Sequence, residues 1–284
     1  MSAHRTTGAR HSAESRVVSE GRHRASVSRT RIGIAATAAA ASVVTFAVVI
    51  HPTASGATEY VRGTVLVSDA MTRTASGGWG SAPVGGKYTV TPATTASVNG
   101  SQATVVLSPG KAALARLDAV ATGDIAAHAD FTVGSLPGAG AYDYLYVRTR
   151  DASAHNYAAR LKVGPGGVTT IGLVREDGDP SKLVNLGDRV TVGTVGVSNR
   201  VAVELETAGT NPVQVRARAW VLGKTQPDWQ VSYSDSSGNR IQGKGALSVY
   251  SYLSAKSPKT MVYVDNVGAI KVFSLTPRPM PART

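Results

Sequence analysis

The sequence of 284 residues predicts an all-β fold, preceded by one apolar segment that is long enough to span a membrane. Alternation of apolar and polar residues with a period of two recurs about a dozen times between Gly, Pro, Asn and Asp residues, which is typical of strands separated by turns. No segment after residue 50 shows the period of an amphipathic helix. About a dozen strands in one domain indicate a two-sheet sandwich or a barrel.

The apolar segment, residues 32–50, contains no charged residue and as a helix would reach roughly 28 Å, about the thickness of a bilayer's hydrocarbon core. The leader before it, residues 1–31, holds seven arginines against two glutamates. By the positive-inside bias, this leader stays cytoplasmic and the rest of the chain is exported. We expect a single-pass signal anchor in the cell membrane. Cleavage near Ala57, which would release a secreted protein, is the alternative because residues 55–57 are small.

Apart from the apolar segment, the sequence divides into four parts. We expect a disordered leader, a linker at 51–59, one β domain at 60–275 and a disordered tail at 276–284, which has too many prolines for a strand. The predicted strands are 61–67, 86–91, 102–107, 124–134, 141–150, 155–163, 167–175, 199–207, 213–222, 229–234, 245–253 and 260–275.

Composition restricts the chemistry and the partners. The chain has no cysteine, which excludes disulfides and thiolate metal sites, so the exported domain must rely on its core. Of the net charge of +12, the leader carries +5 and the exported part carries the remaining +7. This charge favours acidic polysaccharide, teichoic-type polymers or lipid head groups as partners, or serves solubility alone. Nucleic acid is a poor partner for an exported domain without a reader motif.

The polar faces of the predicted strands carry aromatic and arginine side chains. In 141–150, Leu145 and Val147 are expected in the core, so tyrosines and arginines alternate on the other face. The candidate ligand-binding residues chosen in this way are Tyr144, Tyr146, Arg148, Arg160, Arg216, Arg218, Trp220 and Tyr250. Aromatic rings stack on sugars, and arginines bind carboxylate or phosphate with two hydrogen bonds. The alternative is that these are ordinary surface residues of strands.

Two glutamates raise the alternative of catalysis. Glu204 and Glu206 lie two residues apart on one predicted strand, a spacing that some glycosidases use for their acid pair. No third acid follows them, and a hairpin turning near 209–211 would place Glu204 opposite Arg216 in an ion pair. No residue is therefore assigned a catalytic role.

The segment from Ser68 to Val90 resembles the opening of a module found in exported actinobacterial proteins and phage tail proteins. The matching residues are Asp69, Arg73, Trp79, Gly80, Gly85, Gly86 and Tyr88, and Met71 stands where phenylalanine is usual. Stretches at 156–161, 215–220, 227–230 and 264–267 are also similar. The resemblance spans about 60–275 and implies a concanavalin-like, laminin-G-like jelly roll whose first and last strands pair, with sugars bound across its concave sheet.

That pairing of the terminal strands would bring Asp69 and Asp265 together. Carboxylates gathered in this way could hold a structural Ca²⁺, whereas pairing of Asp69 with Arg73 is the simpler alternative. No other cofactor is expected, and nothing in the sequence predicts an oligomeric state.

The sequence therefore favours a non-catalytic, extracytoplasmic binding or cell-surface module for polysaccharide. Two other classes stay open. A glycan-cleaving enzyme would need two acids at catalytic separation on the sugar-binding face. A structural envelope or assembly protein would show an apolar interface patch instead.

Overall fold

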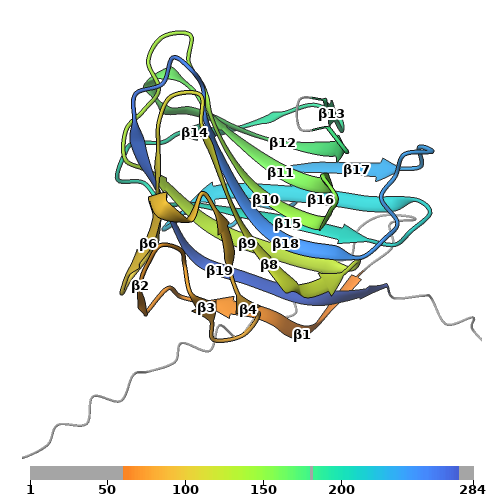
Figure 1. The fold of residues 1–284 in the computed structure, drawn as a ribbon. Helices are drawn as coiled ribbons and strands as arrows, with labels where there is room; N and C mark the ends of the chain where they lie inside the picture. Colours follow the sequence, from red (N-terminus) through yellow and green to blue (C-terminus); the bar gives the residue numbers. More distant parts are fainter. Residues whose placement is uncertain (1–59, 180–181, 275–284) are drawn as a thin grey trace, which may run out of the picture. The chain divides into compact units, whose positions relative to one another are not determined.

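The computed structural model describes residues 60–179 and 182–274, which form a sandwich of antiparallel sheets (Figure 1). The all-β prediction is confirmed by this architecture. The leader, apolar segment, linker and tail predicted at 1–31, 32–50, 51–59 and 276–284 lie outside the described residues. Within the described part, no helix has the length and apolar character that crossing a membrane requires.

The first sheet contains nine strands. In hydrogen-bonded order they are β17 (Val231–Asp235), β16 (Val213–Val221), β15 (Val201–Ala208), β9 (Ile125–Val133), β19 (Thr260–Ser274), β7 (Ala103–Leu107), β6 (Ala96–Asn99) and β2 (Thr74–Ser76), and β1 (Tyr60–Asp69) also pairs with β19. The pairing of β1 with β19 runs from Tyr60 opposite Ser274 to Asp69 opposite Val267. The implied pairing of the first and last strands is therefore present.

The second sheet contains eight strands. Their order is β13 (Leu183–Asn185), β12 (Val168–Asp177), β11 (His155–Val163), β10 (Asp143–Ala152), β18 (Gly245–Leu253), β8 (Ala112–Thr122) and β5 (Thr89–Thr91), and β14 (Val190–Thr194) pairs with β12. The short strands β3 (Ser81–Ala82) and β4 (Gly86–Lys87) form a hairpin of their own. Two single 3₁₀ turns lie at Ala93–Thr95 and Pro165–Gly167.

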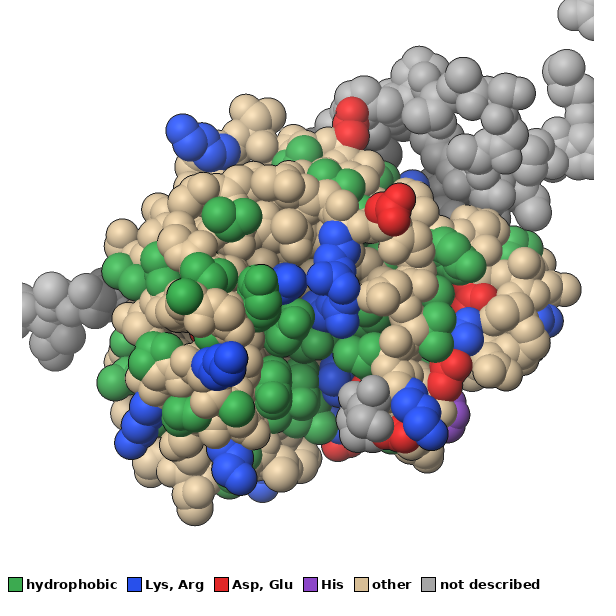
Figure 2. Space-filling view, turned by 90° about the horizontal axis from the view of Figure 1, so that it is seen from above, with side chains coloured by type: hydrophobic (Ala, Val, Ile, Leu, Met, Phe, Trp, Pro, Cys, Tyr) green, Lys and Arg blue, Asp and Glu red, His purple; other side chains and the backbone are tan. Residues whose placement is uncertain are grey.

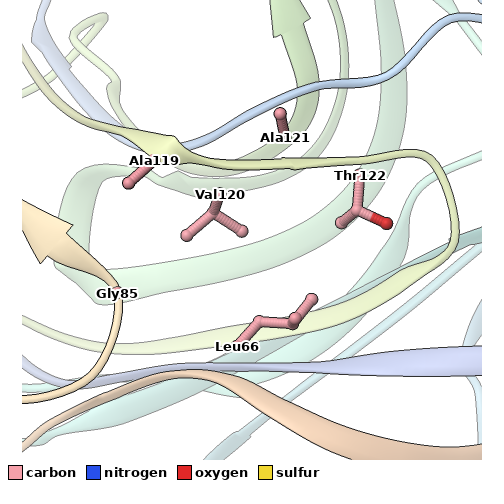
Figure 3. A pocket seen from close by; sticks show the side chains of 6 residues that line it. All are labelled: Leu66, Gly85, Ala119, Val120, Ala121 and Thr122. Atoms are coloured by element: carbon pink, nitrogen blue, oxygen red, sulfur yellow. The ribbon is translucent and has the colours of Figure 1, made fainter.

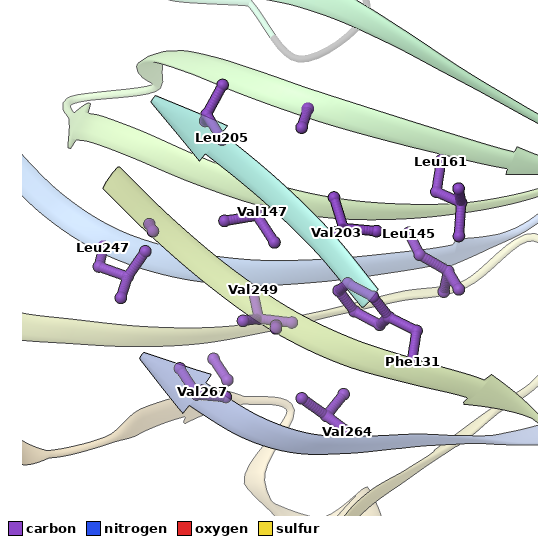
Figure 4. Packing of buried hydrophobic residues seen from close by; sticks show 14 of the residues in the cluster. Phe131, Leu145, Val147, Leu161, Val203, Leu205, Leu247, Val249, Val264 and Val267 are labelled. Carbon is purple, nitrogen blue, oxygen red and sulfur yellow. The ribbon is translucent and has the colours of Figure 1, made fainter. Parts of the chain in front are cut away.

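The hydrophobic core lies between the two sheets. Figure 4 shows side chains of β9, β15 and β19, among them Phe131 and Val203, packed against side chains of β10, β11 and β18, among them Leu145 and Val249. Each of these four residues is at most 3% exposed. Burial of such side chains is the main favourable term in folding. It also decides which face of each strand is left for polar residues, because side chains alternate along a strand.

The residues that carry the family resemblance form a buried corner rather than a binding surface. Arg73 pairs with Asp69 through both guanidinium Nη atoms, at 2.7 and 2.9 Å, and donates from Nε to the carbonyl oxygen of Trp79. The indole of Trp79 is 1% exposed and packs edge-on against the ring of Tyr88, with centroids 5.4 Å apart. This motif therefore specifies how the chain turns into the sandwich.

A polar network seals one end of the core and joins the sheets. The hydroxyl of Tyr157, on β11, donates to Asp235 Oδ2 at 2.7 Å, and Arg175 Nη1, on β12, donates to the same oxygen at 2.7 Å. Asp235 ends β17 in the opposite sheet and is 1% exposed. Buried polar groups need such partners, and here the partners come from both sheets.

Candidate functional site

The eight candidate ligand-binding residues lie on two different sheets. Tyr144, Tyr146, Arg148, Arg160 and Tyr250 lie on the outer face of the second sheet, whereas Arg216, Arg218 and Trp220 lie on β16 of the first sheet. These eight residues therefore do not form a single face. Alternation tells which side of a strand faces the core, but it does not tell to which sheet the strand belongs.

The hydrogen-bonded register arranges the outer face of the second sheet in rows that cross β18, β10, β11 and β12. The rows are Tyr252, Tyr144, Lys162 and Thr170; then Tyr250, Tyr146, Arg160 and Gly172; then Ser248, Arg148, Ala158 and Val174. We call this surface, from Tyr252 to Val174, the tyrosine–arginine face. Aromatic side chains occupy β18 and β10, and basic side chains lie next to them on β10 and β11.

The four tyrosines of these rows touch one another. The rings of Tyr146 and Tyr250 meet edge to face with centroids 5.3 Å apart, and the ring of Tyr144 lies 6.4 Å from that of Tyr146 and 6.3 Å from that of Tyr252. Tyr146 forms a small hydrophobic cluster with Ala158 and Val174, separate from the main core. Burial raises the pKa values of Tyr146 and Tyr250, so both phenols stay protonated near neutral pH.

The arginines of the tyrosine–arginine face lie against these rings. The guanidinium carbon of Arg148 is 4.0 Å from the ring centroid of Tyr250, and that of Arg160 is 5.6 Å from the ring centroid of Tyr144. Arg148 also pairs with Glu176 at 3.4 Å, and Arg160 donates to Asn185 Oδ1 at 2.8 Å. Stacking and hydrogen bonds thus fix both guanidinium groups in place. Figure 2 shows the molecule from above, with Lys and Arg side chains next to hydrophobic side chains near the middle of the view.

Several residues of this face, and others that border it, were missing from the set predicted from the sequence. Tyr252 and Lys162 continue the alternation of Tyr250 and Arg160 and could have been included on that signal alone. Glu176 and Arg189 carried no such signal, because their contribution depends on which strands become neighbours. Arg189 reaches the face over Gly172, where a Cβ atom would lie 2.7 Å from Arg189 Cγ.

The outer face of the first sheet is a set of ion pairs. Glu204 lies opposite Arg218 and pairs with it at 2.7 Å, and Glu206 lies opposite Arg216 and pairs with it at 2.7 Å. The predicted pair of Glu204 with Arg216 is therefore wrong, because the connection between β15 and β16 is centred one residue later than expected. Burial raises the pKa of Glu206, and the charge of Arg216 opposes that shift.

An indole stacks on these ion pairs. The guanidinium carbons of Arg216 and Arg218 both lie 4.5 Å from the ring centroid of Trp229, in the connection between β16 and β17. Glu204 also pairs with Arg62 of β1. The two glutamates that raised the alternative of catalysis are thus held by arginines on the sheet opposite the tyrosines.

The two aspartates proposed for Ca²⁺ are each held by an arginine. Asp69 binds Arg73, as the simpler alternative required, and Asp265 Oδ2 lies 2.8 Å from Arg200 Nη1. Asp69 lies opposite Val267 in the pairing of β1 with β19, so the two carboxyl groups are on neighbouring strands. Burial raises the pKa of Asp265. Over residues 60–179 and 182–274, no group of three or more His, Asp or Glu side chains is placed to hold a metal ion.

Two cavities lie away from the tyrosine–arginine face. One, of about 370 Å³, is bordered by β1 and β8, and Figure 3 shows that its labelled lining, from Leu66 to Thr122, offers a single hydroxyl among apolar side chains. The other, of about 420 Å³, lies between β14 and the end of β16 and includes Trp220 and Lys224. The first cavity lacks the convergent polar groups that a specific ligand site needs. The second has polar side chains in its lining, but the amide oxygens of Asn199 and Gln230 already accept hydrogen bonds from backbone amides.

Comparison with known proteins identifies the fold. No protein-family model matches the sequence, and no curated protein matches it. Among solved structures, the catalytic domain of an endo-1,3-β-glucanase (laminarinase) from Thermotoga petrophila RKU-1 is similar, with a TM-score of 0.50, 8% identity, and coverage of 78% of this chain and all of that one. The laminarinase from Rhodothermus marinus is similar to the same degree, with a TM-score of 0.50, 9% identity, and coverage of 76% and 99%. The chain therefore has a concanavalin-like jelly-roll fold.

Proposed function

We propose that the chain is a non-catalytic, extracytoplasmic module that binds polysaccharide through the tyrosine–arginine face. The observation that carries the proposal is the pair of adjacent rows in which four tyrosines lie beside fixed basic side chains. Aromatic rings offer flat apolar surface to the C–H faces of sugars, and the polar groups beside them bind hydroxyls. Because 8–9% identity shows a shared fold and no more, the activity of the laminarinases is not carried over to this chain.

The half-buried tyrosines make this proposal testable. Tyr144 and Tyr252 lie side by side in the outermost aromatic row and keep part of their rings exposed. Replacing a well-packed aromatic contact residue by alanine commonly costs a binding surface about 2 kcal/mol, or roughly 30-fold in affinity. We expect Tyr144→Ala and Tyr252→Ala each to weaken the binding of the full chain to its best polysaccharide on a glycan array by that order.

A tyrosine of the other sheet supplies the control. Tyr233 lies on β17, is 38% exposed and is remote in register from the tyrosine–arginine face. Tyr233→Ala removes the same side chain and is expected to leave binding unchanged. Absence of binding to every polysaccharide on the array, or equal losses in all three variants, would contradict the proposed function. Release of shorter sugars from the bound polysaccharide would show that the module is catalytic.

A further inference from the structure

The tyrosine–arginine face and its border hold most of the unpaired buried polar atoms of the described chain. Six buried side-chain atoms lack a hydrogen-bond partner in residues 60–179 and 182–274. Four of them belong to this region: Arg148 Nε, Arg160 Nε, Thr170 Oγ1 and Asn156 Oδ1. A buried donor or acceptor without a partner costs about 1–3 kcal/mol, so such atoms are rare and call for an explanation. Their concentration on one face points to a ligand that would pair with them.

The two unpaired arginine donors flank the same ring. Arg160 lies directly across from Tyr146 in register, and Arg148 lies two residues along the same strand, with its guanidinium carbon 5.3 Å from the Tyr146 ring centroid. Both arginines are 7% exposed, so neither is free to swing away into solvent. Guanidinium groups held in this way are ready to donate to one group placed between them, without an ordering cost at binding.

Positive charge exceeds negative charge at this place. Glu176 compensates Arg148, whereas Arg160, Lys162 and Arg189 make no ion pair with any other described residue. Burial lowers the pKa of Lys162, and the positive charges of Arg189 and Arg160 lower it further. Cations crowded on a partly buried surface gain most when an anion joins them.

We infer that the tyrosine–arginine face binds a polyanionic glycan, with one anionic group of the polymer held between Arg148 and Arg160 and a second near Lys162. The inference rests on the proposed function and adds the class of ligand to it. A carboxylate of a uronic acid and a phosphodiester of a sugar-phosphate polymer both accept two hydrogen bonds from guanidinium groups. The sugar rings that join these anionic groups would then lie along the tyrosine rows.

Three polymers distinguish the sources of the anion. The full chain is titrated with a polyuronate, with the same polymer after chemical reduction of its carboxyl groups to neutral hydroxymethyl groups, and with a sugar-phosphate polymer. We expect at least one anionic polymer to bind more than tenfold tighter than the reduced polymer at physiological ionic strength. Raising the salt concentration should weaken that binding, because exposed charges are screened beyond about 10 Å at 0.1 M.

Three variants locate the site. Arg160→Gln removes the fixed guanidinium, and Lys162→Gln removes a half-buried charge whose loss leaves the core intact. Each is expected to weaken binding of the anionic polymer about tenfold or more, as the loss of a charge-assisted contact does. Lys271→Gln is the matched control, because Lys271 is an exposed lysine on β19 of the first sheet and its replacement changes the net charge equally.

The possible outcomes distinguish a failure of the polyanion inference from a failure of the site and of the proposed function. If neither the polyuronate nor the sugar-phosphate polymer binds tighter than the reduced polymer, the polyanion inference is overturned and polysaccharide binding is left standing. A loss in Lys271→Gln as large as that in Lys162→Gln would place the anion on the general basic surface and overturn the site. If neither these polymers nor any polysaccharide of the array binds, the proposed function fails together with the inference.

Discussion

At the residue scale, one buried arginine shows how much a single side chain contributes to the stability of the domain. Arg150 was expected on the outer face of its strand, yet it lies in the closed end of the sandwich with its side chain 0% exposed. A left-handed backbone conformation, with φ of 52°, turns it inward. There it donates to the carbonyl oxygens of Gly123, Gly209 and Ile241. Alternation failed at this residue because a bulge interrupts the register of β10.

Arg150→Met is therefore expected to destabilise the domain by about 3–5 kcal/mol, because the fully buried guanidinium group is lost and three partly buried carbonyl groups each lose a hydrogen bond at once. Chemical denaturation of the full chain measures this change in the free energy of unfolding. Arg240→Met is the control. Arg240 also donates to two carbonyl groups, but from a more exposed place, so its loss should cost less than about 1 kcal/mol. Equal costs for the two variants would contradict the role given to Arg150.

The pH dependence of stability follows from a second buried residue, Asp130. Burial raises the pKa of Asp130 to about 6, although Arg200 opposes the shift. The folded state thus holds a proton that the unfolded state, with a pKa near 4, has lost, so stability falls as the pH rises from about 4 to about 6. In Asp130→Asn this part of the pH dependence should disappear. Denaturation midpoints of both proteins between pH 4 and pH 7 provide the measurement, and parallel curves would contradict it.

At the scale of elements, all twelve predicted strands overlap observed ones, and the long strand β8 was missed together with the short strands β2, β3, β6, β13 and β14. Its sequence, Ala112–Thr122, places alanine and leucine on both faces and contains few β-branched residues. The hydropathy of Ala113 and Ala115, which face the core, therefore does not distinguish them from Ala112 and Leu114, which face outward. Tertiary pairing with β18 makes β8 a strand, in the way that neighbours often override local propensity.

The contact between β18 and β10 depends on a glycine that local sequence does not explain. A Cβ atom at Gly245, the first residue of β18, would lie 2.3 Å from the carbonyl carbon of Arg150 and 2.6 Å from the amide nitrogen of Asp151. Both are backbone atoms of the β10 bulge, which cannot move aside as a flexible side chain can. Gly245→Ala should therefore destabilise the domain by about 1–3 kcal/mol or more.

The neighbouring Gly243 gives the control for this element. A Cβ atom there would meet nothing within 4 Å, so Gly243→Ala should change the free energy of unfolding by less than about 0.5 kcal/mol. Thermal unfolding of the two variants beside the wild type decides the matter. Similar melting temperatures for the two variants would contradict the prediction, because they would show that β10 and β18 can accommodate a Cβ atom at position 245 without a loss of stability.

At the scale of the whole molecule, periodicity predicted a sandwich or a barrel, and the resemblance of the segment from Ser68 to Val90 implied the sandwich with its first and last strands paired. The residues of the tyrosine–arginine face on β10 were also predicted together, because Tyr144, Tyr146 and Arg148 follow one another at every second position. What could not be predicted is the separation of β16 from β10 into opposite sheets, since it depends on long-range pairing. The position of the Arg189 side chain over Gly172 could not be predicted from the sequence for the same reason.

The apolar segment near the N-terminus predicts where the whole chain resides. Residues 32–50 and the arginines before them favour a retained anchor, with the sandwich on the extracytoplasmic side. We expect the protein to sediment with membranes, to resist extraction by high salt and to be dissolved by detergent. A variant that lacks 32–50 should stay in the cytoplasm, because it loses the signal for export together with the anchor. Mass spectrometry of the mature protein tests retention directly, since a first residue near Thr58 in the culture medium would show that the segment is cleaved and the module secreted.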